Sequence, residues 1–113
     1  MVPYAAELKN ITQRLIAFTK SVGAKLLFAI TSPMMAELKP DQDVCELNRR
    51  AVGVMAELNV DTVDLHAAIV GKCGAVPQAS CFGHSNCFSP HCSPEGYEWL
   101  ANSTLVPAIE KLL

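Results

Sequence analysis

The sequence predicts an α/β fold in which two parallel strands are accompanied by three helices. Two short apolar segments, AKLLFAIT (24–31) and NVDTVDLH (59–66), have the length and composition of strands. A segment with helical periodicity lies between them, and this order is that of a βαβ unit. Two strands are too few to cover the edges of a sheet that is buried on both faces. The 113 residues, half of them hydrophobic, therefore look like one part of a larger α/β domain.

The first helix is predicted for residues 4–22. Its apolar side chains recur at intervals of three and four residues and define a stripe expected to face the core: Tyr4, Leu8, Ile11, Leu15, Phe18 and Val22. Gly23 follows as the C-terminal stop, since glycine readily adopts the left-handed conformation found there. The nearly continuous apolar run after Lys25 is typical of a parallel strand covered on both faces.

The middle of the chain is expected to form the crossover helix. Asp41 or Asp43 can cap it. Its predicted core positions are Val44, Leu47, Ala51, Val54, Met55 and Leu58. Cys45 falls within this helix and is expected to be a buried thiol. Asp64 and His66 follow the second strand, at the carboxyl end where α/β proteins bind ligands, and we expect a solvated strand end there.

A Cys-rich loop is predicted for residues 66–92, where helical periodicity fails apart from one turn at LHAAIV (65–70). The last helix should begin at Ser93 as N-cap, with Pro94 in the first helical position. Pro107 should kink or interrupt it. The positions of this helix that are expected to be buried are Tyr97, Leu100, Ala101, Leu105, Ile109 and Leu112.

Charge and hydropathy patterns exclude several classes of function. The 9 basic and 11 acidic residues are scattered and give a net charge of −2, so we expect no nucleic-acid partner. The longest apolar runs are too short to span a bilayer, so no membrane partner is expected either. The N-terminus has no basic region followed by an apolar core, and we expect no secretory signal in it. We also expect no cofactor and no metal.

Four of the five cysteines, Cys73, Cys81, Cys87 and Cys92, lie within twenty residues. An even set in one loop favours disulfides and hence an oxidising compartment, with three pairings open. The alternatives are free thiols or a zinc site built on Cys81, His84 and Cys87, whose spacings lack the paired knuckles of zinc motifs. Cysteine usage indicates a secreted parent protein and the N-terminus does not, so the localisation stays open.

The segment HCSPEGYEWLA (91–101) resembles the last block of the SGNH, or GDSL-type, hydrolases. In that family the catalytic histidine lies five residues before a Gly-Tyr pair that opens the final helix, and His91, Gly96 and Tyr97 have this spacing. The helix and strand order upstream is similar to the second half of that fold. The resemblance implies that residues 1–113 are the C-terminal part of an SGNH-type esterase domain with a flavodoxin-like α/β/α fold. It also implies that His91 is the catalytic base.

Parts of the family's machinery have no counterpart in this chain. The position three residues before the histidine, an aspartate in the family, is Phe88. The Gly-Asp-Ser nucleophile block and the glycine and asparagine of the oxyanion hole lie upstream of the region covered. Ser32 and Ser85 lack the strand-to-helix elbow of a nucleophile. The chain alone is therefore expected to be inactive, with an ester substrate bound only when the N-terminal half is present.

Two functions of different classes follow. One is the C-terminal half of an ester hydrolase, and the other is a non-catalytic module, either a degenerate hydrolase or a Cys-rich binding protein. The open edges of a two-stranded sheet also favour self-association of the isolated chain.

Overall fold

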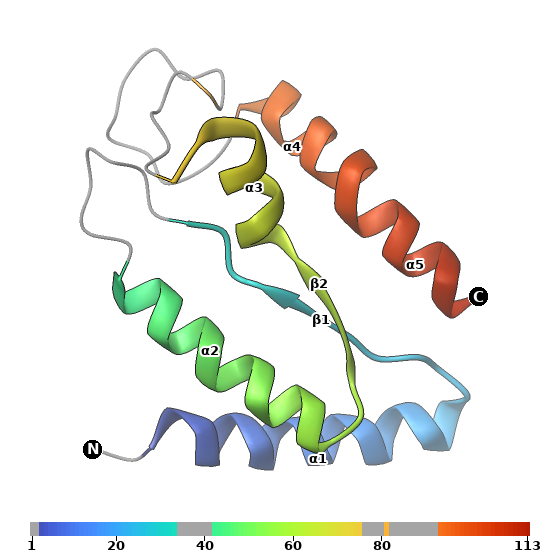
Figure 1. Cartoon of the computed structure of the whole chain (residues 1–113). Helices are drawn as coiled ribbons and strands as arrows, with labels where there is room; N and C mark the ends of the chain where they lie inside the picture. The colour runs from blue at the N-terminus through green and yellow to red at the C-terminus, as the bar shows by residue number, and fades with distance from the viewer. Residues whose placement is uncertain (1–2, 34–41, 76–80, 82–92) are drawn as a thin grey trace.

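The computed structural model describes residues 3–33, 42–75, 81 and 93–113 (Figure 1). In chain order its elements are α1 (Tyr4–Val22), β1 (Leu27–Ile30), α2 (Gln42–Glu57), β2 (Asp61–Asp64), α3 (Leu65–Cys73), α4 (Pro94–Leu100), the π-helical segment η2 (Ala101–Leu105) and α5 (Val106–Leu112). The described part of the chain is thus a mixed α/β structure that is mostly helical. None of its helices is both long and apolar enough to cross a membrane.

The sheet confirms the predicted βαβ unit. β1 and β2 run parallel, in a register that pairs Leu27 with Asp61 and Ile30 with Asp64, and α2 connects them. Each strand has four residues and is shorter than the segment predicted for it. Within the described residues each strand has one neighbour, so the outer edge of each remains open.

The face of α2 that packs on the strands differs from the predicted one at one position. Ala51, Val54 and Met55 are buried, as expected. Leu47 is 43% exposed, and the neighbouring Asn48 occupies the buried position at 8% exposed. The helix is therefore turned so that a polar side chain faces the end of β1.

Asn48 holds the residue that follows β1. Its Nδ2 donates a hydrogen bond to the carbonyl oxygen of Thr31 at 2.8 Å, and its Oδ1 accepts one from the Thr31 amide at 3.1 Å. One side chain thus satisfies both backbone polar groups of a residue that lies just beyond the last strand pair. This bidentate contact ties α2 to the carboxyl end of the sheet.

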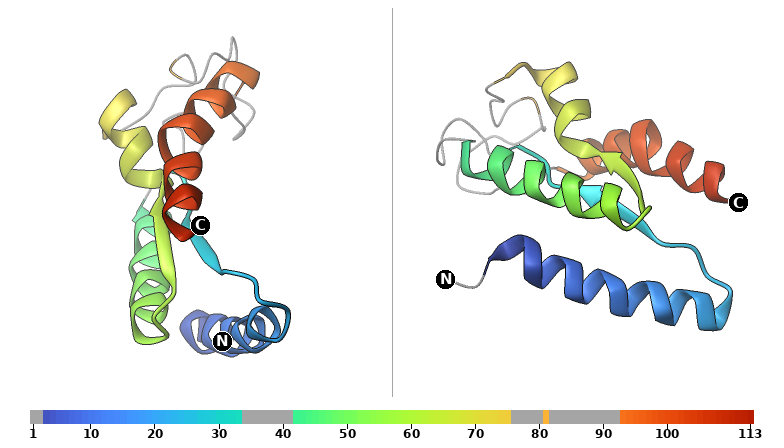
Figure 2. Two further views of the ribbon diagram at one scale, coloured as in Figure 1. Left: turned by 90° about the vertical axis from the view of Figure 1, so that its right-hand side faces the viewer. Right: turned by 60° about the horizontal axis from the view of Figure 1, so that its bottom comes forward.

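α1 begins and ends where the sequence predicts, but its apolar stripe is not buried. Gly23 ends the helix in the left-handed conformation, with φ of 69°. Its buried residue is Thr12, and Lys9 forms an ion pair with Glu57 of α2. Figure 2 shows α1 beside the lower end of α2 and away from α3 and α4. A two-stranded sheet offers too little surface to cover a helix of this length.

The exposed part of the stripe, 44% to 62% exposed, consists of Ile11, Leu15, Phe18 and Val22. The prediction that these four residues face the core of the chain is wrong for the described structure. They form a contiguous apolar row, since they follow one another at intervals of three and four residues along the helix.

The predicted Cys-rich loop of residues 66–92 begins with a helix, which is a correction. α3 spans Leu65–Cys73, and its N-cap is Asp64, whose Oδ1 accepts a hydrogen bond from the Ala67 amide at 2.8 Å. Periodicity missed this helix because most of its residues are apolar, so it lacks the alternation of polar and apolar faces.

The C-terminal helix begins and divides as predicted. Ser93 caps α4, its Oγ accepting a hydrogen bond from the Gly96 amide at 3.1 Å, and Pro94 is the first helical residue. Pro107 lies in the first turn of α5, directly after η2. A proline in a helix has no amide to donate and its ring crowds the carbonyl one turn earlier, and the wide π-helical turn at Ala101–Leu105 relieves both problems.

The α4–η2–α5 run packs against α3 through a small apolar cluster. Ile69 and Leu100 are buried in it, and Leu65, Ala68, Cys73 and Trp99 pack around them. Tyr97 and Ile109, expected to be buried, are about half exposed instead. The left view of Figure 2 shows α2 on one side of β2 and α5 on the other.

We predict that Asn48→Ala lowers the free energy of unfolding by about 1–3 kcal/mol, because it leaves the amide and carbonyl of Thr31 without the hydrogen bonds of Asn48. Denaturant unfolding followed by circular dichroism measures the loss. Asn10→Ala, the same change at an exposed position of α1, should alter stability by no more than about 0.5 kcal/mol. Equal effects of the two substitutions would contradict the role given to Asn48.

We also predict that the isolated chain self-associates through the exposed row on α1. Sedimentation velocity should show a sedimentation coefficient that rises with protein concentration. Phe18→Lys should shift the distribution toward the monomer, whereas Ala17→Lys, at an exposed position beside the row, should not. A chain that remains monomeric at every concentration would contradict self-association through this row.

Candidate functional site

The carboxyl ends of β1 and β2 form one wall of a pocket. The pocket has a volume of about 180 Å³. It is lined by Ile30, Cys45, Asn48, Arg49, Val52, Asp64 and His66. Ligands of open α/β sheets bind outside the carboxyl ends of the strands, where loops and helix starts supply polar groups. Asp64 and His66, which the sequence places after the second strand, therefore lie at the edge where a ligand is expected.

Asp64 has a structural role at this edge of the sheet. As the N-cap of α3 it uses one carboxylate oxygen to accept the Ala67 amide. The side chain is exposed, so the expectation of a solvated strand end is confirmed for it. Its cap also fixes the direction in which α3 leaves the sheet, and this brings His66, the second residue of α3, to the wall of the pocket.

Cys45 and His66 meet across the pocket. The Cys45 Sγ lies 3.6 Å from the His66 Nε2, within hydrogen-bonding range for sulfur. The prediction that Cys45 is buried is wrong, because its side chain is exposed. It lies in the first turn of α2, on the pocket side and away from the buried residues Val54 and Met55 near the other end of the helix. Sequence spacing gave no sign of this pair, since the two residues lie 21 positions apart.

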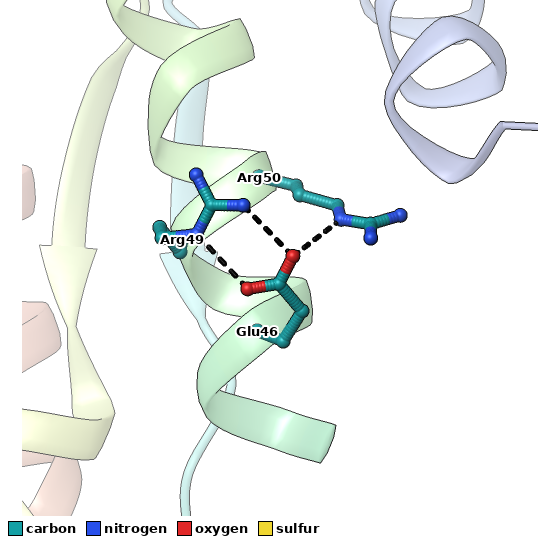
Figure 3. A network of polar contacts seen from close by, with 3 residues as sticks. All are labelled: Glu46, Arg49 and Arg50. Atoms are coloured by element: carbon teal, nitrogen blue, oxygen red, sulfur yellow. Dashed lines mark hydrogen bonds and ion pairs between the residues drawn. The ribbon is translucent and has the colours of Figure 1, made fainter. Parts of the chain in front are cut away.

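Three charged residues of α2 form an ionic network (Figure 3), and one of them, Arg49, also lines the pocket. Arg49 donates to both carboxylate oxygens of Glu46, from Nε at 2.9 Å and from Nη2 at 2.8 Å. Arg50 Nε donates to Glu46 Oε1 at 2.8 Å. The two hydrogen bonds from Arg49 have the largest effect on the pKa of Glu46, and together with the one from Arg50 they lower it from 4.5 to about 2. The carboxylate therefore stays ionised and balances the charge of Arg49, which lines the pocket.

The cysteines of the predicted loop form one disulfide among the described residues, between Cys73 and Cys81, whose Cα atoms are 5.9 Å apart. The bridge links the last residue of α3, Cys73, to Cys81. It also removes Cys81 from the zinc alternative, since a ligand must be a free thiolate. Cys87, Cys92 and His84 lie outside the described residues. In the described part of the chain no group of three or more His, Cys, Asp or Glu side chains could hold a metal ion.

The predicted catalytic base His91 also lies outside the described residues, as does Phe88. The helix start that accompanies His91 in the sequence is described, however. Ser93 is buried, caps α4 and leaves Gly96 and Tyr97 in the first turns of that helix. Figure 1 shows this start beside α3, beyond the carboxyl ends of the strands, and Gly96 lines a small pocket with Lys72 and Cys73 at the C-terminal end of α3.

A larger hollow of about 630 Å³ lies between β2 and the C-terminal helices. Its lining includes Asp61 and Thr62 of β2, Ser103 and Thr104 of η2, and Lys111 of α5. The lining combines strand residues with the wide turn before Pro107. Neither Cys45 nor His66 lines this hollow.

Comparison of the chain with protein-family models, with curated proteins and with solved structures finds no match. A functional assignment therefore depends on the residues and geometry described above.

We predict that the pKa of Glu46, measured by a carbon-detected NMR titration of its carboxyl group, is about 2. Arg49→Gln should raise it more than Arg50→Gln, because Arg49 donates two hydrogen bonds and Arg50 one. The lowered pKa favours the folded state above pH 4.5, and this contribution is lost as the pH falls toward 2. A pKa that neither substitution changes would refute the network.

Proposed function

We propose that the chain is the C-terminal part of an SGNH-type hydrolase of carboxylic esters, with an α/β/α fold completed by an N-terminal half. The observation that carries the proposal is the start of α4. The family's final block needs a Gly-Tyr pair at the start of its last helix, and Gly96 and Tyr97 lie in the first turn of α4, after the Ser93 cap and Pro94. The parallel pairing of β1 and β2 through α2 gives further support.

The proposal assigns His91 to the role of general base. His91 is two residues upstream of Ser93 in the sequence, and α4 starts beside α3, on the side toward which the carboxyl ends of the strands point (Figure 1). A serine supplied by the N-terminal half would attack the ester carbonyl while His91 takes the serine proton. His91 would then give this proton to the leaving alkoxide. The oxyanion hole would also come from the N-terminal half.

Phe88 replaces the aspartate that orients the imidazole in the family. The Nδ1 proton of His91 then needs another acceptor, either a backbone carbonyl or Asp64. One oxygen of Asp64 already accepts the Ala67 amide as the cap of α3. A backbone carbonyl is therefore the better candidate, and the base would work in a dyad.

A non-catalytic Cys-rich module is the second candidate. The observation that favours it is the disulfide between Cys73 and Cys81, which stiffens the end of α3 without contributing to ester hydrolysis. The upstream coding sequence separates the two candidates. An in-frame Gly-Asp-Ser block followed by an asparagine block supports the hydrolase, and a stop codon in its place supports the module.

We predict that His91→Ala in the protein restored with its N-terminal half lowers kcat on a short-chain aryl ester by on the order of 10³-fold or more. Loss of the general base removes proton transfer in both steps of acyl transfer. Phe88→Asp should leave kcat unchanged or raise it, since it supplies the family's carboxylate.

His84→Ala is the matched control at another histidine of the Cys-rich loop, and it should keep the activity. Residues 1–113 alone should show no turnover above background. Retention of most activity by His91→Ala would remove the histidine from the mechanism.

A further inference from the structure

The contact between Cys45 and His66 has a chemistry of its own. The two side chains come from different helices, α2 and α3, and meet at 3.6 Å on the wall of the pocket at the sheet edge. A thiol in contact with an imidazole can pass its proton to the ring, and the thiolate is the nucleophilic form of cysteine. Cys45 is also exposed, so a small molecule can reach its sulfur.

We propose that Cys45 is a reactive thiol, activated by His66, that is modified by small disulfides through S-thiolation. The thiol proton passes to Nε2 of His66. The sulfur of Cys45 then bonds to one sulfur of the disulfide, and the bond between the two sulfurs of the reagent breaks. The second half leaves as a thiolate and takes up a proton, so the products are a mixed disulfide at Cys45 and one free small thiol. No other oxidant is needed.

The surroundings of the sulfur favour its ionised form. Cys45 is the fourth residue of α2, so it lies in the first turn, where the helix dipole stabilises negative charge. Asp43, on the same helix, adds a negative charge that opposes a thiolate. The carboxylate of Glu46 is already paired with Arg49 and Arg50.

The other elements at the pocket contribute Asp64 and His66. The carboxylate of Asp64 accepts the Ala67 amide as the cap of α3, and the His66 imidazole is the group in contact with the sulfur.

The pocket admits a reagent of limited size. Its volume is about 180 Å³, and Ile30 and Val52 supply apolar surface beside the polar groups. A small disulfide has apolar substituents next to its sulfurs, so it matches this mixture. The site uses neither His91 nor a catalytic serine, and it is therefore independent of the proposed ester hydrolysis.

The test measures the rate at which 2,2′-dithiodipyridine modifies Cys45 in the full chain. Reaction is stopped with acid, and the modified fraction is read by mass spectrometry from tryptic peptide 26–49, in which Cys45 is the only cysteine. At pH 7 the native protein should react at least about 5-fold faster than the same chain in denaturant. Its pH–rate profile should have an apparent pKa below the value of about 8.5 found for free cysteine.

His66→Gln should lower the native rate and raise the apparent pKa toward the free-cysteine value of about 8.5. Lys72→Gln, the same replacement at an exposed position of α3, should leave both values unchanged. Circular dichroism shows whether each variant is folded.

A native rate no higher than that of the unfolded chain overturns the proposal, as does a folded His66→Gln variant with an unchanged rate and profile. If His66→Gln fails to fold, the wild-type comparison decides the question by itself. In that case an apparent pKa of about 8.5 in the native protein overturns the proposal, and a lower one supports it.

Discussion

The bidentate hydrogen bond between Asn48 and the backbone of Thr31 sets the rotation of α2, and much of the described structure depends on that rotation. With Asn48 turned inward, Ala51 and Met55, which follow it at three and seven residues, are buried, and Leu47 is turned outward. Cys45, three residues before Asn48, and Arg49, directly after it, then reach the pocket. The buried side chain of Asn48 thus positions both the core face of α2 and the two other polar side chains, Cys45 and Arg49, that α2 contributes to the pocket.

Elements with local signals could be predicted from the sequence. The bounds of α1 follow from its periodicity and from Gly23, and the start of α4 follows from Ser93 and Pro94. The division of the last helix follows from Pro107, because a proline cannot continue the hydrogen-bond pattern of the preceding turn. The parallel pair follows from two apolar segments joined by a helix. The caps and the proline are signals of one or two residues, and the strands and helices are read from consecutive residues, so no contact between distant parts of the chain is needed to recognise them.

Features that depend on distant contacts could not be predicted in this way. Periodicity shows which face of α1 is apolar but not whether the rest of the chain can cover it, and in the described structure the row around Phe18 remains exposed. A buried Asn48 interrupts an apolar pattern and gains its hydrogen bonds only when β1 lies beside it. Cys45 and His66 come together only through the packing of two helices on one sheet edge. The sequence does not reveal the full length of α3 for a different reason: most residues of this helix are apolar, so no polar face marks its period.

α3 connects the Cys45 pocket with the start of α4. It begins at Asp64 on the wall of the Cys45 pocket and ends at Cys73, where the disulfide to Cys81 fastens it. Between these points Ile69 packs against Leu100, which holds α4 against α3. The start of α4, where the proposed base His91 enters in the sequence, and the His66 imidazole are thus both held by one nine-residue helix. Because the Asp64 cap sets the direction of that helix, a change in the cap would move the imidazole and the start of α4 together.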